Sequence, residues 1–279
     1  MSDPVPPLAP DDPSLAGKTI VVMPAYNAAM TLEDTWNLIP RQIVDEIILV
    51  DDASLDATIT VANGLGISVI PHPHNVGYGG NQKTCYMEAL RQGATTVVML
   101  HPDGQYDPGL IPDLIAPISA GEADMVLGSR LATRGAARAG GMPWWKYAAN
   151  RFLTTVENAV LGRQFSELHT GYRAYSRRFL LTVPFLRNSN DFVFDTEVIV
   201  QAVSTGMRVV EVPVSTRYFA DASSIGLRTS VVYGLKTLWT LVRYCLHRAN
   251  LHQAKFLQPA RSGVLPGGHG PINITPPSP

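Results

Sequence analysis

Short apolar runs rich in β-branched residues alternate with helical patterns over the first half of the chain. A continuous apolar run predicts a strand that is buried on both faces. We expect strands at 19–23, 46–50, 67–70, 96–100 and 125–127, and helices at 31–39, from near 56, at 80–91 and at 108–120. This alternation predicts an α/β fold with an open, mainly parallel central sheet.

Two of these helices carry capping signals. Thr31 and Asp34 fit a capping box at the start of the first helix, and Ser54 fits the N-cap of the second. Both signals predict that the chain turns sharply into a helix directly after a strand.

The pattern changes after Pro143. We expect a long helix at 144–161, a short strand at 171–175, a helix at 192–204, a strand at 208–214 and a helix at 228–248. Proline-rich residues 1–16 predict a disordered arm, and the Pro- and Gly-rich residues 251–279 predict a flexible tail. Residues 17–250 are interpreted as one domain whose halves, 17–140 and 141–250, have different roles.

Composition narrows the class of protein. The 279 residues are 46% apolar and 16% charged, with a formal net charge of −1. These values exclude a disordered chain, a long coiled coil and a globally basic nucleic-acid binder. Any phosphate-binding ability therefore depends on a local patch, and we expect no nucleic-acid partner.

The number of cysteines and the length of the apolar runs indicate the cellular compartment of the protein. Cys85 and Cys245 are far apart and form neither a disulfide framework nor a zinc pattern. The first residues lack the basic end and apolar run of a signal peptide, and no run reaches 18 apolar residues. We expect a cytoplasmic protein. It either diffuses freely or is attached peripherally to the inner face of the membrane.

Polar residues follow four of the predicted strands. In open α/β sheets, ligands bind beyond the carboxyl ends of the strands, so these residues predict a site. They are Pro24, Tyr26 and Asn27 after the first strand, Asp51 and Asp52 after the second, 101–108 after the fourth and 128–130 after the fifth.

Acidic residues at two of these ends each have two interpretations. Asp52 can accept hydrogen bonds from a base or ribose, or it can cap the following helix. The alternation of His101, Asp103 and Gln105 places three donor atoms on one side of an extended segment, where they can hold a divalent cation with a diphosphate. The prolines and glycine around them equally favour a simple turn.

Residues 75–81 form a Gly-rich segment ahead of a helix, which can cradle phosphate. They do not satisfy the dinucleotide fingerprint, because Gln82 holds the last glycine position and the segment follows the third strand. We expect Gly79 to allow a close backbone approach to a ligand or to a neighbouring helix. A nicotinamide-dependent dehydrogenase is disfavoured.

Basic residues gather in a stretch without acids between Asp124 and Glu157. Its cations are Arg130, Arg134, Arg138, Lys146 and Arg151. A glycine-rich basic loop can close over phosphate, or it can be an ordinary solvated loop. Farther along, Asp195 in the acidic segment 191–197 is either a functional group, acting as a general base or positioning the acceptor, or a favourable first-turn acid of a helix.

The predicted helix at 228–248 is basic and amphipathic. Its apolar residues at helical spacing are Val231, Leu235, Leu238, Val242 and Leu246. Such a helix packs on its own domain or lies at a membrane surface. Both interpretations stay open.

Eight stretches occur together in one order: VVMPAYNA, EIILVDDASLDAT, NVGYGGNQ, LHPDGQYDP, ADMVLGSR, HTGYRAYSRR, DFVFDTEV and VVEVPVSTRY. They cover roughly residues 18–230, and the chain resembles the dolichol-phosphate mannose synthase-like branch of glycosyltransferase family 2. The resemblance implies one domain of the glycosyltransferase A type, with a nucleotide half at 17–140 and an acceptor half at 141–250. It also implies a nucleotide-diphosphate sugar, a divalent metal and inversion of the anomeric centre in one displacement.

The resemblance also implies roles for individual residues. Those implied for the nucleotide sugar are Pro24, Tyr26, Asn27, Asp52, Gly79, Asp103, Gln105 and Arg130. Asp103 and Gln105 would hold the metal, with His101 as a third ligand. Asp195 is implied as the acid of the acceptor half, beside Asp103 and Arg130 as catalytic residues, and Arg134, Arg138 and Arg228 would bind phosphate.

Three positions depart from the family pattern. His101 replaces the first acid of the Asp-x-Asp metal motif, and Ala28 replaces a common glutamate. The basic Ser-Lys segment that the family has late in the chain corresponds to residues 222–228, of which only Arg228 is basic. Neutral histidine suits Mn²⁺ better than Mg²⁺, and both metals are considered.

The function expected from the sequence is an inverting hexosyltransferase. It would use a UDP- or GDP-linked sugar and a polyprenyl phosphate or another acceptor. The alternatives are a sugar-nucleotide-binding scaffold protein with weakened catalysis and a nucleotidyltransferase, which would release pyrophosphate.

Overall fold

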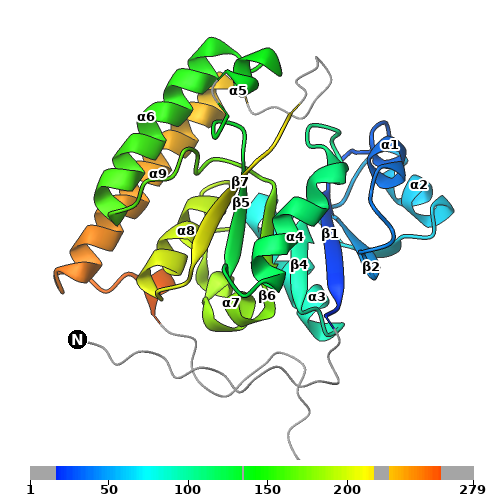
Figure 1. Cartoon of the computed structure of the whole chain (residues 1–279), viewed down its shortest axis with the longest axis horizontal. Coiled ribbons are helices and arrows are strands. Elements are labelled where there is room, and N and C mark those ends of the chain that lie inside the picture. The colour runs from blue at the N-terminus through cyan, green and yellow to red at the C-terminus, as the bar shows by residue number, and fades with distance from the viewer. Residues whose placement is uncertain (1–16, 134, 217–225, 259–279) are drawn as a thin grey trace, which may run out of the picture.

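The structure is a computed structural model that describes residues 17–133, 135–216 and 226–258 (Figure 1). Arg134, most of the late segment 222–228, the predicted arm and most of the predicted tail lie outside the described residues.

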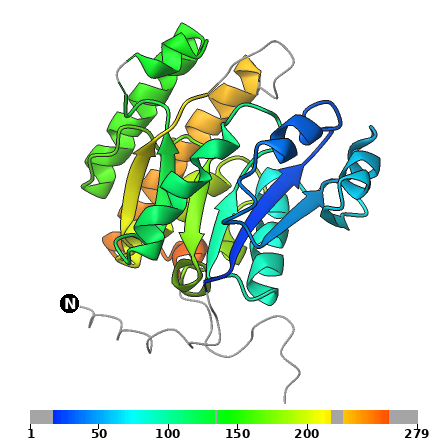
Figure 2. The ribbon, with the colours of Figure 1, turned by 45° about the vertical axis from the view of Figure 1, so that its right-hand side comes forward.

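A twisted sheet forms the centre of the molecule (Figures 1 and 2). Its strands are β1 (Thr19–Ala25), β2 (Glu46–Asp51), β3 (Ser68–Pro71), β4 (Thr96–Met99), β5 (Met125–Ser129), β6 (Arg173–Ser176) and β7 (Val209–Pro213). Their order is β3-β2-β1-β4-β6-β5-β7, and β6 runs antiparallel to both of its neighbours. The predicted α/β fold with a mainly parallel sheet is confirmed.

Helices cover both faces of this sheet (Figure 2). They are α1 (Leu32–Asn37), α2 (Thr58–Gly64), α3 (Tyr78–Arg91), α4 (Ile111–Ser119), α5 (Ala136–Ala139), α6 (Trp144–Leu161), α7 (Arg177–Thr182), α8 (Phe194–Ser204) and α9 (Leu227–Arg248), with 3₁₀ turns at Pro108–Leu110, Phe185–Arg187 and Lys255–Leu257. Side chains alternate along β1, so that Val22 joins the apolar cluster under α3 and α8, whereas Val21 joins the cluster under α1, α2 and α4.

The strand β6 joins the two halves of the chain. It lies between β4 and β5, where Tyr175 pairs with Val97 and Ala174 pairs with Val126. Strands from both sequence halves therefore share one sheet.

The predicted cap at Ser54 is wrong, whereas Thr31 is the N-cap residue of α1 but makes no side-chain capping bond. The hydroxyl of Thr31 donates to the carbonyl oxygens of Ala28 and Pro102 and does not cap α1. The hydroxyl of Ser54 accepts the N–H of Asn27, and α2 begins only at Thr58. Both hydroxyls therefore tie together loops at the carboxyl edge of the sheet.

The predicted tail is packed over its first residues. Ala254 and Phe256 are buried in the core, and the Gln201 amide donates to the carbonyl oxygen of Phe256 at 2.6 Å. The packed part of the chain therefore extends to Gln258, because an apolar side chain in this segment closes over α8.

Candidate active site

The loops after β1 and β2 are bonded to one another at the carboxyl edge of the sheet. Asp52 N–H donates to the carbonyl oxygen of Ala25 at 2.8 Å, and Leu55 N–H donates to Oδ1 of Asn27 at 2.8 Å. Asn27 has a positive φ of 53°, which this small amide tolerates. Tyr26 is exposed beside it, whereas Pro24 is buried within β1. Parallel strand ends thus bring the four predicted nucleoside residues together.

The carboxylate of Asp52 organises the Gly-rich segment. Its Oδ1 accepts the N–H of Val76 at 2.8 Å and lies 2.9 Å from Nδ1 of His72, and its Oδ2 accepts the N–H of Gly77 at 3.1 Å. These bonds compensate the burial of the charge. The sequence missed this loop-holding role. Neighbouring Asp51 also has a buried Oδ1, which has no hydrogen-bond partner among the described residues.

Gly79 serves the packing of two segments. Its N–H donates to the carbonyl oxygen of Asn190 at 2.8 Å, and an added Cβ would lie 2.5 Å from the carbonyl oxygen of Ser189 and 2.7 Å from Cβ of Phe194. The close approach predicted for Gly79 is therefore to the segment that leads into α8. That segment fills the space in which a ligand would contact Gly79.

The loop after β4 contains the predicted metal residues. Oδ1 of Asp103 accepts the N–H of Gln105 at 3.0 Å, which is the turn that the alternative interpretation predicted. The His101 ring stacks on Tyr78 with centroids 5.5 Å apart, and its Nε2 lies 3.4 Å from the Tyr78 hydroxyl. His101 thus contacts an aromatic ring at the start of α3.

Burial lowers the pKa of His101, although Asp103 and Asp195 act in the opposite direction, so the neutral ring is favoured. Within residues 17–133, 135–216 and 226–258, no group of three or more His, Cys, Asp or Glu side chains could hold a metal ion. A cation here would therefore need oxygen atoms that a ligand supplies beside Asp103.

Asp195 lies at the start of α8 in a buried polar cluster. The Tyr78 hydroxyl donates to its Oδ2 at 2.8 Å, and Nη1 of Arg173 lies 3.3 Å from its Oδ1. Arg173 is fully buried, and its Nε also donates to the carbonyl oxygen of Thr170 at 2.8 Å. Burial and the Asp195 charge raise the pKa of Tyr78, so that its hydroxyl stays protonated and donates. His101, Tyr78 and Asp195 therefore link the loop after β4 to the start of α8.

Arg130 follows β5 and is held by Glu167. Its Nε donates to Oε1 of Glu167 at 2.8 Å, its N–H donates to Oε2 at 2.7 Å, and its Nη2 donates to the carbonyl oxygen of His169 at 2.6 Å. Glu167 is fully buried. The sequence missed this partner, because it lies in an irregular segment between two predicted elements.

The other predicted phosphate residues are not brought into this cluster. Arg138 is exposed on α5, and Arg228 is exposed in the first turn of α9. Arg134 lies outside the described residues.

A second buried cluster includes His169, whose carbonyl oxygen accepts a hydrogen bond from Arg130. Nε2 of His169 is 2.9 Å from Oε2 of Glu157, and its Nδ1 is 2.7 Å from the Tyr233 hydroxyl. Glu157 belongs to α6 and Tyr233 to α9, and Glu157 is fully buried. His169 therefore connects both helices to the segment whose carbonyl oxygen holds Arg130.

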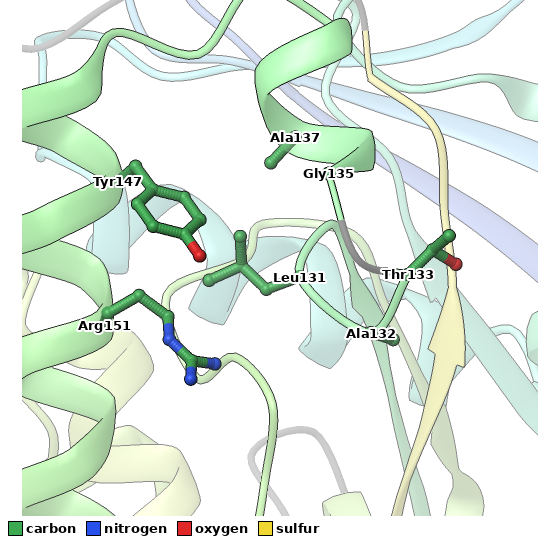
Figure 3. Close-up of a pocket in the computed structure, with 7 residues that line it drawn as sticks. All are labelled: Leu131, Ala132, Thr133, Gly135, Ala137, Tyr147 and Arg151. Atoms are coloured by element: carbon green, nitrogen blue, oxygen red, sulfur yellow. The ribbon is translucent and has the colours of Figure 1, made fainter.

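A pocket of about 410 Å³ opens between the loop after β5 and α6 (Figure 3). Its lining residues are Leu131, Ala132, Thr133, Gly135, Ala137, Tyr147 and Arg151. Tyr147 and Arg151 point from α6 toward Leu131 (Figure 3). Burial and the Arg130 charge lower the pKa of nearby Lys146. The lining of the pocket thus combines apolar side chains with the polar side chains of Thr133, Tyr147 and Arg151.

Comparisons with known proteins agree with this architecture. A family model described as Glycosyl transferase family 2 matches residues 20–183. The chain is 26% identical over 246 residues to a UDP-N-acetylglucosamine–dolichyl-phosphate N-acetylglucosaminyltransferase of Methanococcus voltae, covering 82% of this chain and 96% of that protein. It is 27% identical over 206 residues to the polyprenol monophosphomannose synthase of Mycolicibacterium smegmatis, covering 71% and 77%.

Solved structures share the fold. Glucosyl-3-phosphoglycerate synthase from Mycobacterium tuberculosis, in complex with Mn²⁺, UDP and glucosyl-3-phosphoglycerate, matches with a TM-score of 0.63 and 19% identity, covering 86% of this chain and 82% of that one. None of the helices that the structure describes is both long and apolar enough to span a membrane.

Proposed function

The chain belongs to glycosyl transferase family 2, and we propose that it transfers a hexose from a UDP- or GDP-linked sugar to a polyprenyl phosphate with inversion. The observation that carries this proposal is the contact chain from the His101–Asp103 loop through Tyr78 to Asp195, with Arg130 directly after β5, which β6 separates from β4. The printed names of two relatives, which include dolichyl phosphate and polyprenol, support the acceptor class.

On the donor side, Pro24, Tyr26, Asn27 and Asp52 are proposed to line the nucleoside pocket. Asp103 and Gln105 are proposed to hold a divalent metal together with the diphosphate. A single carboxylate completed by phosphate oxygens is a common arrangement for Mg²⁺, and Mn²⁺ accepts the same ligands. The metal would neutralise charge on the departing diphosphate. His101 stays outside the ligand set in this proposal, because its ring stacks on Tyr78.

On the acceptor side, Arg130 is proposed to bind phosphate, whereas exposed Arg138 and Arg228, which lie outside its cluster, and Arg134 stay predictions from the sequence. An acceptor phosphate monoester is largely ionised at neutral pH, since its second pKa is about 6. One of its oxygens attacks the anomeric carbon, the bond to the nucleoside diphosphate breaks, and no proton has to be removed. Asp195 then positions the acceptor, and it would act as the base only for a hydroxyl acceptor.

Two observations favour a second candidate function. The described residues offer no three-ligand metal cluster, and a histidine replaces the first acid of the metal motif. A protein that binds a sugar nucleotide without efficient turnover fits these features. If the acceptor is a polyprenyl phosphate, as proposed, the chain would act at the inner, cytoplasmic face of a membrane.

The test is a transfer assay with labelled UDP- and GDP-hexoses, Mn²⁺ or Mg²⁺, and a polyprenyl phosphate. We expect a lipid-linked sugar and a free nucleoside diphosphate as products. Asp103→Asn should lower turnover by about 100-fold or more, since it removes a charge that stabilises the transition state. Asp113→Asn, an exposed acid on α4, is the matched control.

Unchanged turnover in Asp103→Asn would contradict the metal assignment. Binding of a sugar nucleotide without transfer to any acceptor would favour the second candidate function.

A further inference from the structure

The side chain of His169 is buried and contacts two long helices at once. Its Nε2 lies 2.9 Å from Oε2 of Glu157 on α6, and its Nδ1 lies 2.7 Å from the hydroxyl oxygen of Tyr233 on α9. The rings of His169 and Tyr233 meet edge to face, with centroids 5.5 Å apart. Contacts at both ring nitrogens and at the ring itself therefore fix the orientation of His169 between the two helices.

The carboxylate of Glu157 depends on His169. Glu157 is fully buried, and its two carboxylate oxygens accept no hydrogen bond from the residues that the structure describes. The approach of the His169 ring is therefore an ion-pair contact, and it compensates the burial of this carboxylate. A buried carboxylate that loses its partner is strongly unfavourable. This pairing keeps the ring of His169 against α6.

One face of α6 contacts three consecutive residues of the segment 167–170. Residues three and four positions apart lie on the same side of a helix. The three contacts are Asn150 to the Glu167 carboxylate at 2.7 Å, Thr154 to the Leu168 N–H at 3.4 Å, and Glu157 to the His169 ring at 2.9 Å. This helix face therefore sets the position of the segment.

The same segment holds two arginines. It belongs to neither a helix nor a strand, so its carbonyl oxygens can accept hydrogen bonds from side chains. The carbonyl oxygen of His169 accepts a hydrogen bond from Nη2 of Arg130 at 2.6 Å, and that of Thr170 accepts one from Nε of Arg173 at 2.8 Å. Arg173 in turn lies 3.3 Å from Oδ1 of Asp195. The position of this backbone therefore affects both guanidinium groups.

We propose that His169 is a positioning residue for the acceptor. Its ring, fixed between Glu157 and Tyr233, holds the segment 167–170 where the carbonyl oxygens orient Arg130 and Arg173. This inference rests on the proposed function, because Arg130 affects the acceptor as the proposed phosphate ligand. His169 acts through these arginines and not on the reacting atoms. A small displacement of a phosphate ligand weakens acceptor binding.

The transfer assay tests this role through the KM values of the two substrates. His169→Phe keeps an aromatic ring but removes both nitrogens. We expect it to raise the KM for polyprenyl phosphate by about tenfold and to leave the KM for the sugar nucleotide unchanged. A variant that is only partly folded lowers kcat and leaves both KM values unchanged. His169→Gln should recover most of the loss, because its amide can donate to Glu157.

A milder variant and a matched control accompany this test. Tyr233→Phe removes only the hydroxyl at Nδ1 and keeps the packed ring, so it should raise the acceptor KM a few-fold even where His169→Phe fails to fold. Asp124→Asn removes a buried charge from an ion pair directly before β5, at the opposite end of the strand from Arg130. This control should leave the acceptor KM at the wild-type value.

A second measurement does not depend on transfer. The Nε–Hε resonance of Arg130 in a nuclear magnetic resonance spectrum, assigned with Arg130→Lys, reports the hydrogen bonds of this guanidinium. We expect His169→Phe to shift that resonance, His169→Gln to shift it less, and Asp124→Asn to leave it in place.

Two results would overturn the proposal. One is an Arg130 resonance that stays in place in His169→Phe, and the other is an acceptor KM that responds to His169→Phe no more than to Asp124→Asn. A chain that transfers no sugar contradicts the proposed function, whereas a shifted Arg130 resonance in that chain still supports the link from His169 to Arg130. The two failures are therefore distinguishable.

Discussion

His101 occupies the position of the first acid in the family's metal motif, and its contacts explain why a histidine fits there. Its ring lies against Tyr78, and an added Cβ on Gly171 would lie 2.9 Å from that ring. A carboxylate at this position would face Asp195 across Tyr78, and like charges in a buried space disfavour each other. A neutral imidazole avoids that repulsion and fills the space. The replacement of the first acid in the motif therefore has a local packing reason.

Gly79→Ala tests the packing role of this glycine. The added methyl group would meet backbone at Ser189 and the Cβ of Phe194, neither of which can rotate away. We expect destabilisation of about 1–3 kcal/mol in denaturant unfolding. Gly64→Ala in α2 is the control, because nothing lies within 4 Å of its added Cβ. Equal stability of the Gly79 variant and wild type would refute the packing role.

Residue types predicted which side chains gather at the carboxyl edge of the sheet better than they predicted the partners of each side chain. Asp52, Asp103 and Asn27 were found because they follow apolar strands, and their position at a sheet edge depends only on strand direction. The partners of Arg130 and Asp195, Glu167 and Arg173, come from segments 37 and 22 positions away in the chain. A pattern of neighbouring residues contains no information on such distant pairs.

At the scale of elements, an ion cluster fastens the starts of β5 and β7. Asp124 is buried, and its carboxylate accepts hydrogen bonds from the N–H and the guanidinium of Arg208, with Arg178 3.5 Å away. The bond from Asp124 N–H to the carbonyl oxygen of Arg208 extends the strand pairing. One acid thus joins two strands that are distant in sequence.

Asp124→Asn should make the free energy of unfolding depend less on pH in the acid range. Burial acts to raise the pKa of Asp124, but hydrogen bonds and charge from Arg208 outweigh it and the pKa is lowered. A lowered folded-state pKa gives stability that is present above the unfolded value of about 3.9 and is lost as pH falls through the folded value. The variant should therefore lose about 1–3 kcal/mol near neutral pH and less at acid pH.

Urea unfolding over a range of pH measures this dependence, and exposed Glu122→Gln is the matched control. A variant whose stability falls with acid as steeply as that of wild type would contradict the assignment.

Elements themselves were predicted well where the hydrophobic period was clear. Each predicted strand exists, and α6 matches its predicted bounds. The antiparallel direction of β6 was not predicted, because it depends on pairing with β4 some 77 residues away in register. The short helices α5 and α7 are too brief to show a period. The buried face of α9 was also hidden, because threonines form part of it.

At the scale of the whole molecule, donor binding should stabilise the fold. A ligand at a hundred times its dissociation constant adds about 2.7 kcal/mol, which for a domain of this size is a shift of about 5–10 °C in unfolding temperature. We expect this shift with one nucleotide class among UDP- and GDP-sugars and only when Mn²⁺ or Mg²⁺ is present. Thermal scans of wild type and Asp103→Asn measure it, and an equal shift without metal would argue against a metal-bridged diphosphate.

The position of β6 also affects which strands can pair while the chain is being synthesised. The strand β5 pairs only with β6 and β7 in the described sheet, and both are synthesised after it. Until residues 173–176 emerge, β5 has no neighbour, and the sheet can extend only as far as β4. The free edge of β4 is then a template for wrong pairing, including pairing with another nascent chain. The sheet therefore cannot be completed in the order in which its strands are synthesised.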